Sequence, residues 1–373
     1  MEIANELKIV KWIKKEYNEW VLLGSPENTE VTHLDISYSN IKGSLVLNNL
    51  PNLQELDCSH NQITEIERLK LPNLQILNCS DNQITEIEIL DFPKLQELDC
   101  HHNKITTIEG LDLPNLQTLY CNGNQITNIE ELNLPKLQEL YCGYNQITEI
   151  EGLDLLNLQR LSCSSNQITT IEGLDLPNLQ ELYCNNNQIR DIEGLELPNL
   201  QILDCYHNQI TKIEILELPN LQELYCEHNQ ITKIEGLDLP NLQKFDCSNN
   251  QITTLSFALP TTLRMLYYSG NPVEYIAPNI QRFLNRSKTS QGVYNDSQNV
   301  HNHHVQECVR TSISRLIGLK PTIVNVRDYI VNDSVLTETV KQLLMEYMDD
   351  TTVHSVVQVT FEELLRCVLS VAD

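Results

Sequence analysis

Cysteine is the residue with the most chemistry to offer in this chain, which has 373 residues and 12 cysteines. Thiolates bind metals and act as nucleophiles, and two thiols can form a disulfide. Ten of them recur every 21 residues, at Cys58, Cys79, Cys100, Cys121, Cys142, Cys163, Cys184, Cys205, Cys226 and Cys247. One cysteine per interval, with no histidine in the same row, does not make a metal-ligand set, and disulfides would need an oxidising compartment. We therefore expect reduced thiols that pack as small buried apolar groups.

The other two cysteines, Cys308 and Cys367, lie outside this ladder. Cys308 follows His301, His303 and His304 in an H-x-H-H-x₃-C pattern. Zinc uses such ligands, but the spacing matches no standard zinc knuckle and no second ligand pair is near. We favour a metal-free role, expect no cofactor, and leave metal binding here open. Either thiol could act as a nucleophile, but both lie on or beside apolar helical faces, where burial lowers reactivity.

The cysteines mark a repeated unit, because an asparagine follows each one after three residues, at Asn61, Asn82, Asn103, Asn124, Asn145, Asn166, Asn187, Asn208, Asn229 and Asn250. Within one unit, Leu56 and Cys58 are two residues apart and share one face of a strand. Pro72-Asn73 then ends the unit. One unit cannot bury its own apolar row, but stacked units form a continuous core. We expect each asparagine to bond backbone groups of its own and of adjacent units.

The pattern L-x-x-L-x-C-x-x-N-x-I, which begins at Leu53, resembles the leucine-rich-repeat family, with cysteine in place of a leucine. The resemblance covers residues 31–276 as about twelve units. The ending I-x-x-I-E-G-L-x-L-P-N is similar to the short repeats of phosphatase-regulatory subunits and bacterial internalins. The cysteine- and isoleucine-rich composition also resembles repeat proteins of giant DNA viruses of amoebae. The resemblance implies an α/β repeat solenoid, a right-handed horseshoe or arc with a parallel concave β-sheet.

The short unit constrains the outer side of this solenoid. After a strand and two turns, few of the 21 residues remain. We therefore expect 3₁₀ turns or extended chain, and no full helix, on the convex side.

Three variable positions per unit alternate with the buried row and should face outward, as do Glu55, Asp57 and Ser59 in the first full unit. Together these rows are acidic and rich in tyrosine, a residue favoured at protein interfaces. The alternative is that tyrosine only suits a strand. We predict that the partner-binding residues are Glu97, Asp99, Tyr120, Glu139, Tyr141, Arg160, Glu181, Tyr183, Asp204, Tyr206, Glu223 and Tyr225.

The two ends of the chain depart from the repeat. Residues 1–30 should form a helical cap over the open core, because apolar residues recur there with helical period. These are Ile9, Trp12, Ile13, Trp20 and Val21. Residues 277–373 read as a linker followed by a small helical domain of unknown type.

The charge of the chain narrows its partners. The formal net charge is −26, and most of the excess lies within residues 31–276. Nucleic acids and anionic membranes are poor candidates because binding them needs clustered lysine or arginine. A protein with a basic surface or segment fits better. The start of the chain has no secretion signal and no apolar run spans a bilayer, so we expect a cytoplasmic protein, or one of the host cytoplasm if it is viral.

The sequence therefore predicts a non-catalytic scaffold that binds a basic protein partner on an acidic, tyrosine-rich concave face. One alternative is an enzyme, since the resemblance includes bacterial effectors whose C-terminal domains transfer ubiquitin through a cysteine. Cys308 or Cys367 would serve here, although the Cys-x-Asp loop of those ligases is absent. Another is a phosphatase-targeting subunit, by analogy of repeat type alone. The oligomeric state stays open.

Overall fold

The computed structural model describes residues 11–47, 49–66, 69–87, 92–130, 132–214, 218–235 and 237–287. The chain divides into two compact units, Met1–Ile280 and Gln281–Asp373, and nearly all described residues belong to the first. The expected C-terminal helices, the cluster from His301 to Cys308, and Cys367 lie outside the described residues.

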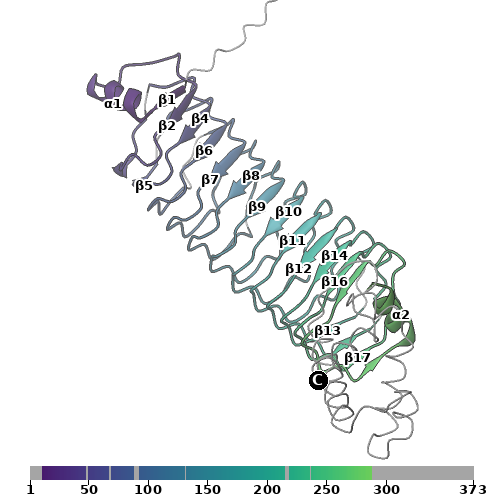
Figure 1. Cartoon of the computed structure of the whole chain (residues 1–373). Helices are drawn as coiled ribbons and strands as arrows, with labels where there is room; N and C mark the ends of the chain where they lie inside the picture. The colour runs from purple at the N-terminus through teal and green to yellow at the C-terminus, as the bar shows by residue number, and fades with distance from the viewer. Residues whose placement is uncertain are drawn as a thin grey trace, which may run out of the picture. The chain divides into compact units, whose positions relative to one another are not determined.

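The first unit is built on one sheet of 13 parallel strands, to which each repeat contributes one short strand (Figure 1). In order they are β1 (Lys11–Ile13), β2 (His33–Asp35), β4 (Glu55–Asp57), β6 (Ile76–Asn78), β7 (Glu97–Asp99), β8 (Thr118–Tyr120), β9 (Glu139–Tyr141), β10 (Arg160–Ser162), β11 (Glu181–Tyr183), β12 (Ile202–Asp204), β14 (Glu223–Tyr225), β16 (Lys244–Asp246) and β18 (Met265–Tyr267). Neighbouring strands pair without a register shift, so Tyr120 lies opposite Tyr141. Equivalent positions of successive repeats therefore form straight rows across the sheet.

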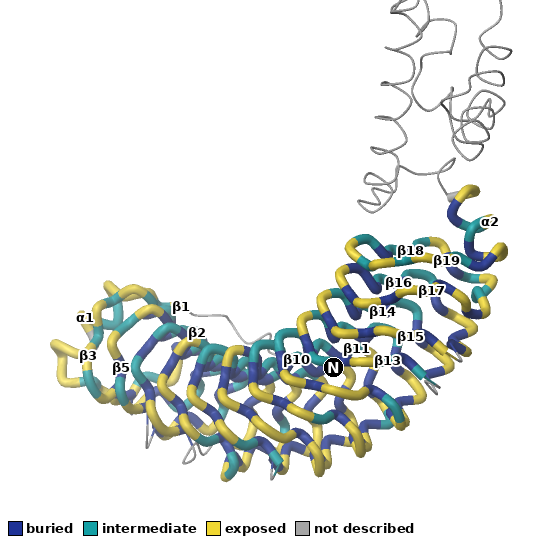
Figure 2. The backbone as a smooth tube through the Cα atoms, turned by 90° about the horizontal axis from the view of Figure 1, so that it is seen from below, coloured by how far each residue is buried: buried dark blue, intermediate teal, exposed yellow. Residues whose placement is uncertain are grey.

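The sheet lines the inner side of the curved repeat region, and the outer side consists of turns and short extended segments (Figure 2). Three pairs of short parallel strands reinforce the outer chain. They are β3 (Lys42–Ser44) with β5 (Gln62–Glu65), β13 (Lys212–Ile213) with β15 (Lys233–Ile234), and β17 (Thr254–Leu255) with β19 (Tyr275–Ile276). Between Leu23 and Ala277 the described chain contains no helix. The α/β solenoid is confirmed, and its convex side is extended as the short unit predicts.

The ten ladder cysteines form one row of the core. All are fully buried and carry free thiols. Their backbone amides donate to the carbonyl of the next strand, as Cys163 N does to Tyr183 O at 2.8 Å. The Cys163 thiol lies 3.6 Å from the same oxygen. Burial raises the pKa of the Cys163 thiol to about 12, so the ladder thiols are neutral packing groups, and they are poor nucleophiles and metal ligands.

The asparagines three residues later join each repeat to the one before it. Asn145 is representative: its Nδ2 donates to the carbonyls of Cys142 and Gly143 in its own repeat and to Cys121 in the preceding one. Its Oδ1 accepts from Ile126 N at 3.0 Å. The prediction that each asparagine bonds its own and an adjacent unit is confirmed. Loss of this side chain would leave the buried Ile126 amide without a partner and would remove one of two donors from each of the three carbonyls.

A second asparagine ladder, which the sequence reasoning did not predict, runs along the exposed end of the units. Asn157 Nδ2 donates to the carbonyl of Pro135 in the preceding repeat at 2.7 Å. The same bond to a residue of the preceding repeat is made by Asn73, Asn115, Asn178, Asn199, Asn220 and Asn241. Each repeat is thus tied to its neighbour at both ends of its strand.

The residue before each buried asparagine adopts a left-handed backbone, with φ between 51° and 70°. We call these residues the edge row: His60, Asp81, His102, Gly123, Tyr144, Ser165, Asn186, His207, His228, Asn249 and Gly270. Glycine, asparagine, aspartate and histidine tolerate this conformation best, and they fill most of the row. The edge row follows the carboxyl ends of the strands and stacks its side chains in the same register.

The N-terminal cap differs from its prediction. Residues Lys11–Ile13 form strand β1, which pairs with β2 in parallel, and helix α1 begins only at Lys14 and ends at Leu22. The expected buried apolar face is also wrong in part, since Ile13 is 52% and Val21 45% exposed. Without β1, the backbone amides and carbonyls along the edge of β2 would have no hydrogen-bond partners within the sheet. A strand supplies these partners, and a helix in its place would not.

A second helix, α2, spans Pro278–Ser287. Within the described residues, no helix is long and apolar enough to cross a bilayer.

Candidate functional site

Two rows of side chains flank the buried leucine row of the sheet and form its concave surface. In β6 to β12, β14 and β16, the strands of this sheet, the central residue is buried and the two outer residues are half-buried. Eleven of the twelve residues predicted to bind a partner lie on β7, β8, β9, β10, β11, β12 and β14. The twelfth, Tyr206, lies two residues beyond the end of β12 and is half-buried too. The structure thus brings all twelve onto one continuous surface.

Arg160 organises the centre of this surface. Its guanidinium donates two parallel hydrogen bonds to the Glu181 carboxylate, both 2.8 Å, and a third to the hydroxyl of Tyr141 at 3.1 Å. Glu139 lies 3.7 Å from the same guanidinium. The hydrogen bonds from Arg160 lower the pKa of Glu181. The central basic residue is therefore already neutralised within the protein and is not a free cation for a partner.

Three of the concave tyrosines form a hydrogen bond within their own strand. Tyr141 Oη donates to Glu139 and Tyr183 Oη to Glu181, each at 2.8 Å, and Tyr225 makes the same contact with Glu223. Burial, followed by the bond to Glu181, raises the pKa of Tyr183 to about 12. These hydroxyls are committed, so what the tyrosines offer a partner is ring area.

The rings form two aromatic groups. Tyr120 and Tyr141 stack with centroids 4.7 Å apart and planes 13° from parallel. Further along, Lys244 Nζ donates to Tyr225 Oη at 2.9 Å and lies 4.5 Å from the centre of that ring. A stacked pair loses little conformational entropy on binding, which favours a role as an anchor.

An acidic hollow of about 250 Å³ lies over the N-terminal strands of the same surface. Its carboxylates are Asp35, Glu55, Asp57, Glu97 and Asp99. Three basic side chains pair with these carboxylates: Lys11 Nζ is 3.9 Å from Asp35, His33 Nε2 is 3.1 Å from Glu55, and His101 Nδ1 is 2.5 Å from Asp99. In the described part of the chain, Glu97 has no ion pair or side-chain hydrogen bond. The acidic hollow therefore has more carboxylates than cations and suits a guanidinium or ammonium group.

A second acidic group lies toward the C-terminal strands. Burial raises the pKa of Asp204 to about 6 and that of Glu227 to about 7. One carboxyl oxygen of Glu227 is buried without a hydrogen-bond partner. These carboxyls are partly protonated near neutral pH, so they attract a basic partner less strongly than the acidic hollow does.

The structure also corrects the choice of residues. The third variable position of each unit, that of Ser59, was expected to face outward, but Ser59, Ser80 and Ser248 are buried. Conversely, the sequence reasoning selected Glu97 and Asp99 but not the other three carboxylates of the acidic hollow. Asp35 lies in a degenerate repeat. Its alignment with Asp57 was the only feature of the sequence that could have identified it as part of this surface.

A family model described as leucine-rich repeats in two copies matches residues 29–71, 72–113, 114–155, 156–197, 198–239 and 219–260. The chain belongs to the leucine-rich-repeat family. Proteins of this family generally act as scaffolds for protein–protein interaction. A search of curated proteins found no significant match.

Solved structures agree with the leucine-rich-repeat assignment. The functional domain of InlJ from Listeria monocytogenes, described as including a cysteine ladder, is 28% identical, with a TM-score of 0.53, over 66% of this chain and 53% of that one. This leucine-rich-repeat chain thus spans about half of the InlJ chain. The leucine-rich repeat domain of APL1B covers 77% of this chain and 87% of its own at 20% identity and a TM-score of 0.61, which supports the fold alone.

Proposed function

We propose that this leucine-rich-repeat protein is a non-catalytic scaffold that binds a basic segment of a protein partner along its concave face. The observation that carries this proposal is the acidic hollow, whose five carboxylates outnumber the three basic groups that pair with them, Lys11, His33 and His101. A lysine or arginine of the partner would enter there, and the segment would continue over the rings of Tyr120 and Tyr141. Charge would steer the approach and aromatic contact would supply affinity.

This proposal refines the set of predicted partner-binding residues. The side chains of Arg160, Glu139 and Glu181 already pair with one another. We call these three residues the floor of the concave face, because their pairing holds them rigid. Glu97 is free and Glu55 is only partly offset by His33. We therefore expect the largest energetic contribution from the acidic hollow and the stacked tyrosines.

The test starts from a peptide display library selected on the immobilised full chain. We expect selected peptides to be enriched in lysine and arginine. For the best peptide, Glu55→Gln/Glu97→Gln should weaken binding by about 2 kcal/mol and reduce its dependence on salt, measured by fluorescence anisotropy. Glu149→Gln/Glu151→Gln removes the same charge from exposed positions on the outer chain and should leave affinity within about twofold.

Variants of the rings and floor test the rest of the face. Tyr141→Ala/Tyr183→Ala should also cost about 2 kcal/mol or more, and Glu139→Lys/Glu181→Lys should slow association and also disrupt the floor, because both carboxylates that pair with Arg160 are lost. If neither these nor the hollow variant changes affinity, the binding surface lies elsewhere.

We also propose a cellular compartment for the protein and consider its alternative functions. The ten reduced thiols support a reducing compartment, the cytoplasm or the host cytoplasm if the chain is viral. Nucleic acids and anionic membranes are poor candidates for partners, because the chain carries a formal net charge of −26. A ubiquitin-transfer activity depends on Cys308 or Cys367, and modification of either by a ubiquitin-based active-site probe would favour the enzyme over the scaffold. No observation favours the phosphatase-targeting role.

A further inference from the structure

The edge row brings together histidines that are 42 residues apart in the sequence. His60, Asp81 and His102 occupy the same position in three successive repeats, and each has a φ of 52°. Parallel strands are spaced about 4.8 Å apart, so the stack sets imidazole and carboxylate groups at separations that a single metal ion can bridge. His101, one residue earlier in its repeat, adds another imidazole.

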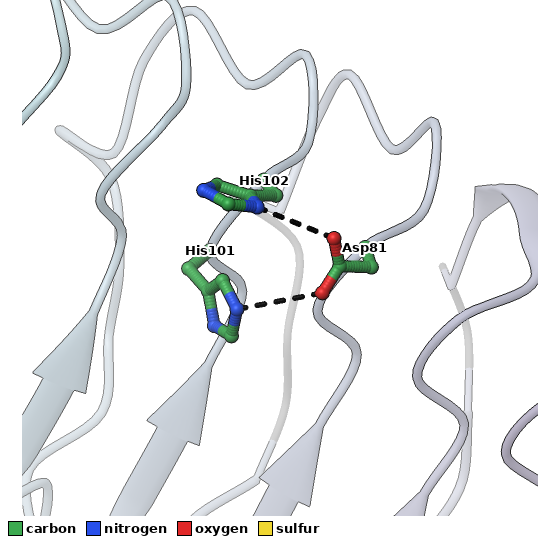
Figure 3. A group of neighbouring side chains, drawn as sticks. All are labelled: Asp81, His101 and His102. Carbon is green, nitrogen blue, oxygen red and sulfur yellow. Dashed lines mark hydrogen bonds and ion pairs between the residues drawn. The ribbon is translucent and has the colours of Figure 1, made fainter.

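The side chains converge on Asp81 (Figure 3). His102 Nδ1 lies 3.2 Å from Asp81 Oδ1, and His101 Nε2 lies 3.5 Å from Asp81 Oδ2. One ligand atom from each of these three residues fits within a mutual distance of 4.8 Å. His60 Nε2 flanks the group at 3.6 Å from Asp81 Oδ2. The cluster therefore offers two nitrogens and one oxygen around one point.

Asp99 orients His101 as a second-shell carboxylate orients a metal-bound histidine. Its Oδ1 lies 2.5 Å from His101 Nδ1. With the proton on Nδ1, His101 donates to Asp99 and presents the lone pair of Nε2 toward Asp81. Carboxylate–histidine pairs of this kind fix the tautomer and raise the basicity of zinc ligands.

Gly123 leaves the space that the His102 ring occupies. It is the edge-row residue of the next repeat, with a φ of 67°. A Cβ at this position would lie only 2.3 Å from His102 Cδ2. A larger residue at 123 would therefore displace the ring and its Nδ1 from Asp81.

We propose that Asp81, His101 and His102 bind a divalent transition-metal ion of the zinc class. A set of two imidazoles and one carboxylate suits zinc, and hard cations that prefer all-oxygen ligands fit it less well. Asp99 holds His101 in position and Gly123 makes room for His102. Three protein ligands leave a further coordination position for water or for a side chain of a bound protein. The competing account is that the cluster holds only His–Asp ion pairs.

The test measures zinc binding to the full chain by titration calorimetry under reducing conditions. It uses a background with His301→Ala, His303→Ala, His304→Ala, His354→Ala, Cys308→Ser and Cys367→Ser, so that no histidine or cysteine of the tail can bind the ion. We expect one equivalent of Zn²⁺ to bind, and Co²⁺ to give the visible absorption of a low-coordinate nitrogen and oxygen site.

Asparagine substitutions keep the left-handed backbone, because asparagine occurs in the edge row at residues 186 and 249. Asp81→Asn/His102→Asn should abolish the bound equivalent and the cobalt absorption. The matched control His207→Asn/His228→Asn alters two stacked edge-row histidines elsewhere and should change neither. Asp99→Asn and Gly123→Ala should each weaken affinity, the former roughly 10–100-fold.

Two results would overturn the proposal. One is the absence of any bound zinc equivalent in the background protein. The other is an Asp81→Asn/His102→Asn variant that folds, by circular dichroism, and still binds zinc with the parental stoichiometry and affinity.

Discussion

At the residue scale, the buried asparagine is the strongest link between neighbouring repeats. Asn145 is the partner of the buried Ile126 amide and donates to three carbonyls, each of which also accepts from one other group. Asn157, on the exposed ladder, makes one bond in contact with solvent. Because water can replace the exposed bond but not the buried ones, the two residues should differ greatly in energetic weight.

We predict that Asn145→Ala lowers the free energy of unfolding by about 2–4 kcal/mol, because it leaves the buried Ile126 amide without a partner and removes hydrogen bonds to three buried carbonyls. Asn157→Ala should cost about 0.5 kcal/mol. Urea unfolding followed by circular dichroism measures both. Equal losses for the two variants would mean that the buried ladder is not the stronger link.

Glu227 makes the stability of the repeat region depend on pH. Folding raises its pKa from 4.5 to about 7, chiefly by burial. From about pH 4.5 to 7 the folded chain holds a proton that the unfolded chain releases, so stability falls as pH rises through this window. Glu227→Gln removes the charge, and we expect it to stabilise the protein by about 1 kcal/mol at pH 8 and by little at pH 4.5.

Thermal unfolding at the two pH values checks this prediction. The exposed Glu149→Gln serves as the control for loss of one negative charge. A stabilisation of the same size at both pH values would rule out the titration of Glu227 as the cause.

How far single residues could be predicted depends on whether their contacts lie within one repeat or between repeats. Strand alternation places Glu139 and Tyr141 on the same face, so their meeting follows from the sequence. The neutralisation of Arg160 also needs the register of β9, β10 and β11. The approach of Asp81 to His102 also depends on the left-handed backbone at both residues. The period-two alternation of a strand does not predict the backbone conformation that follows the strand.

At the element scale, strand β1 covers the edge of the sheet. It supplies the hydrogen-bonding partner of β2 at the N-terminal end. The sequence favoured a helix here because the apolar residues also fit a period of 3.6, and three residues are too few to show strand alternation. Helical periodicity correctly predicts α1 from Lys14 onward. It does not predict that the edge of β2 requires a strand partner.

We predict that deletion of residues 1–22 exposes the β2 edge and causes the protein to self-associate, since an unpaired edge strand binds other strands. Sedimentation velocity should show a concentration-dependent increase in mass. Restoring only residues 11–22 should reverse it, whereas a truncated protein that stays at its original mass would show that β1 is not needed to protect the edge.

At the scale of the whole molecule, the ten buried thiols make the stability of the folded chain depend on pH in the alkaline range. Folding raises the pKa of every ladder cysteine above its ordinary value of 9.0, mainly through burial. Above pH 9 the unfolded chain releases these protons and the folded chain keeps them. Stability is thus complete below pH 9 and falls as pH rises above it.

Each thiol lowers the free energy of unfolding by about 1.4 kcal/mol per pH unit in this range, so ten together give about 14 kcal/mol per unit if the repeats unfold as one. A typical stability of about 5–15 kcal/mol would be lost within roughly one unit. We predict cooperative alkaline unfolding near pH 10. Urea unfolding between pH 8 and 9.8 gives the slope, which Cys142→Ala/Cys163→Ala/Cys184→Ala/Cys205→Ala should reduce by about four tenths. An unchanged slope would exclude the thiols as its source.

The buried asparagine ladder also bears on how such a chain can change over generations. Each side chain reaches only its own turn and the preceding one, so no turn depends on the total number of turns. Excision of residues 143–163 would join Cys142 to Ser164 in step, with both ends intact and one strand fewer. Near-identical neighbouring segments favour unequal recombination in the gene, which adds or removes whole turns. A lineage carrying this chain could therefore lengthen or shorten its recognition surface by copying errors alone, without passing through a misfolded intermediate.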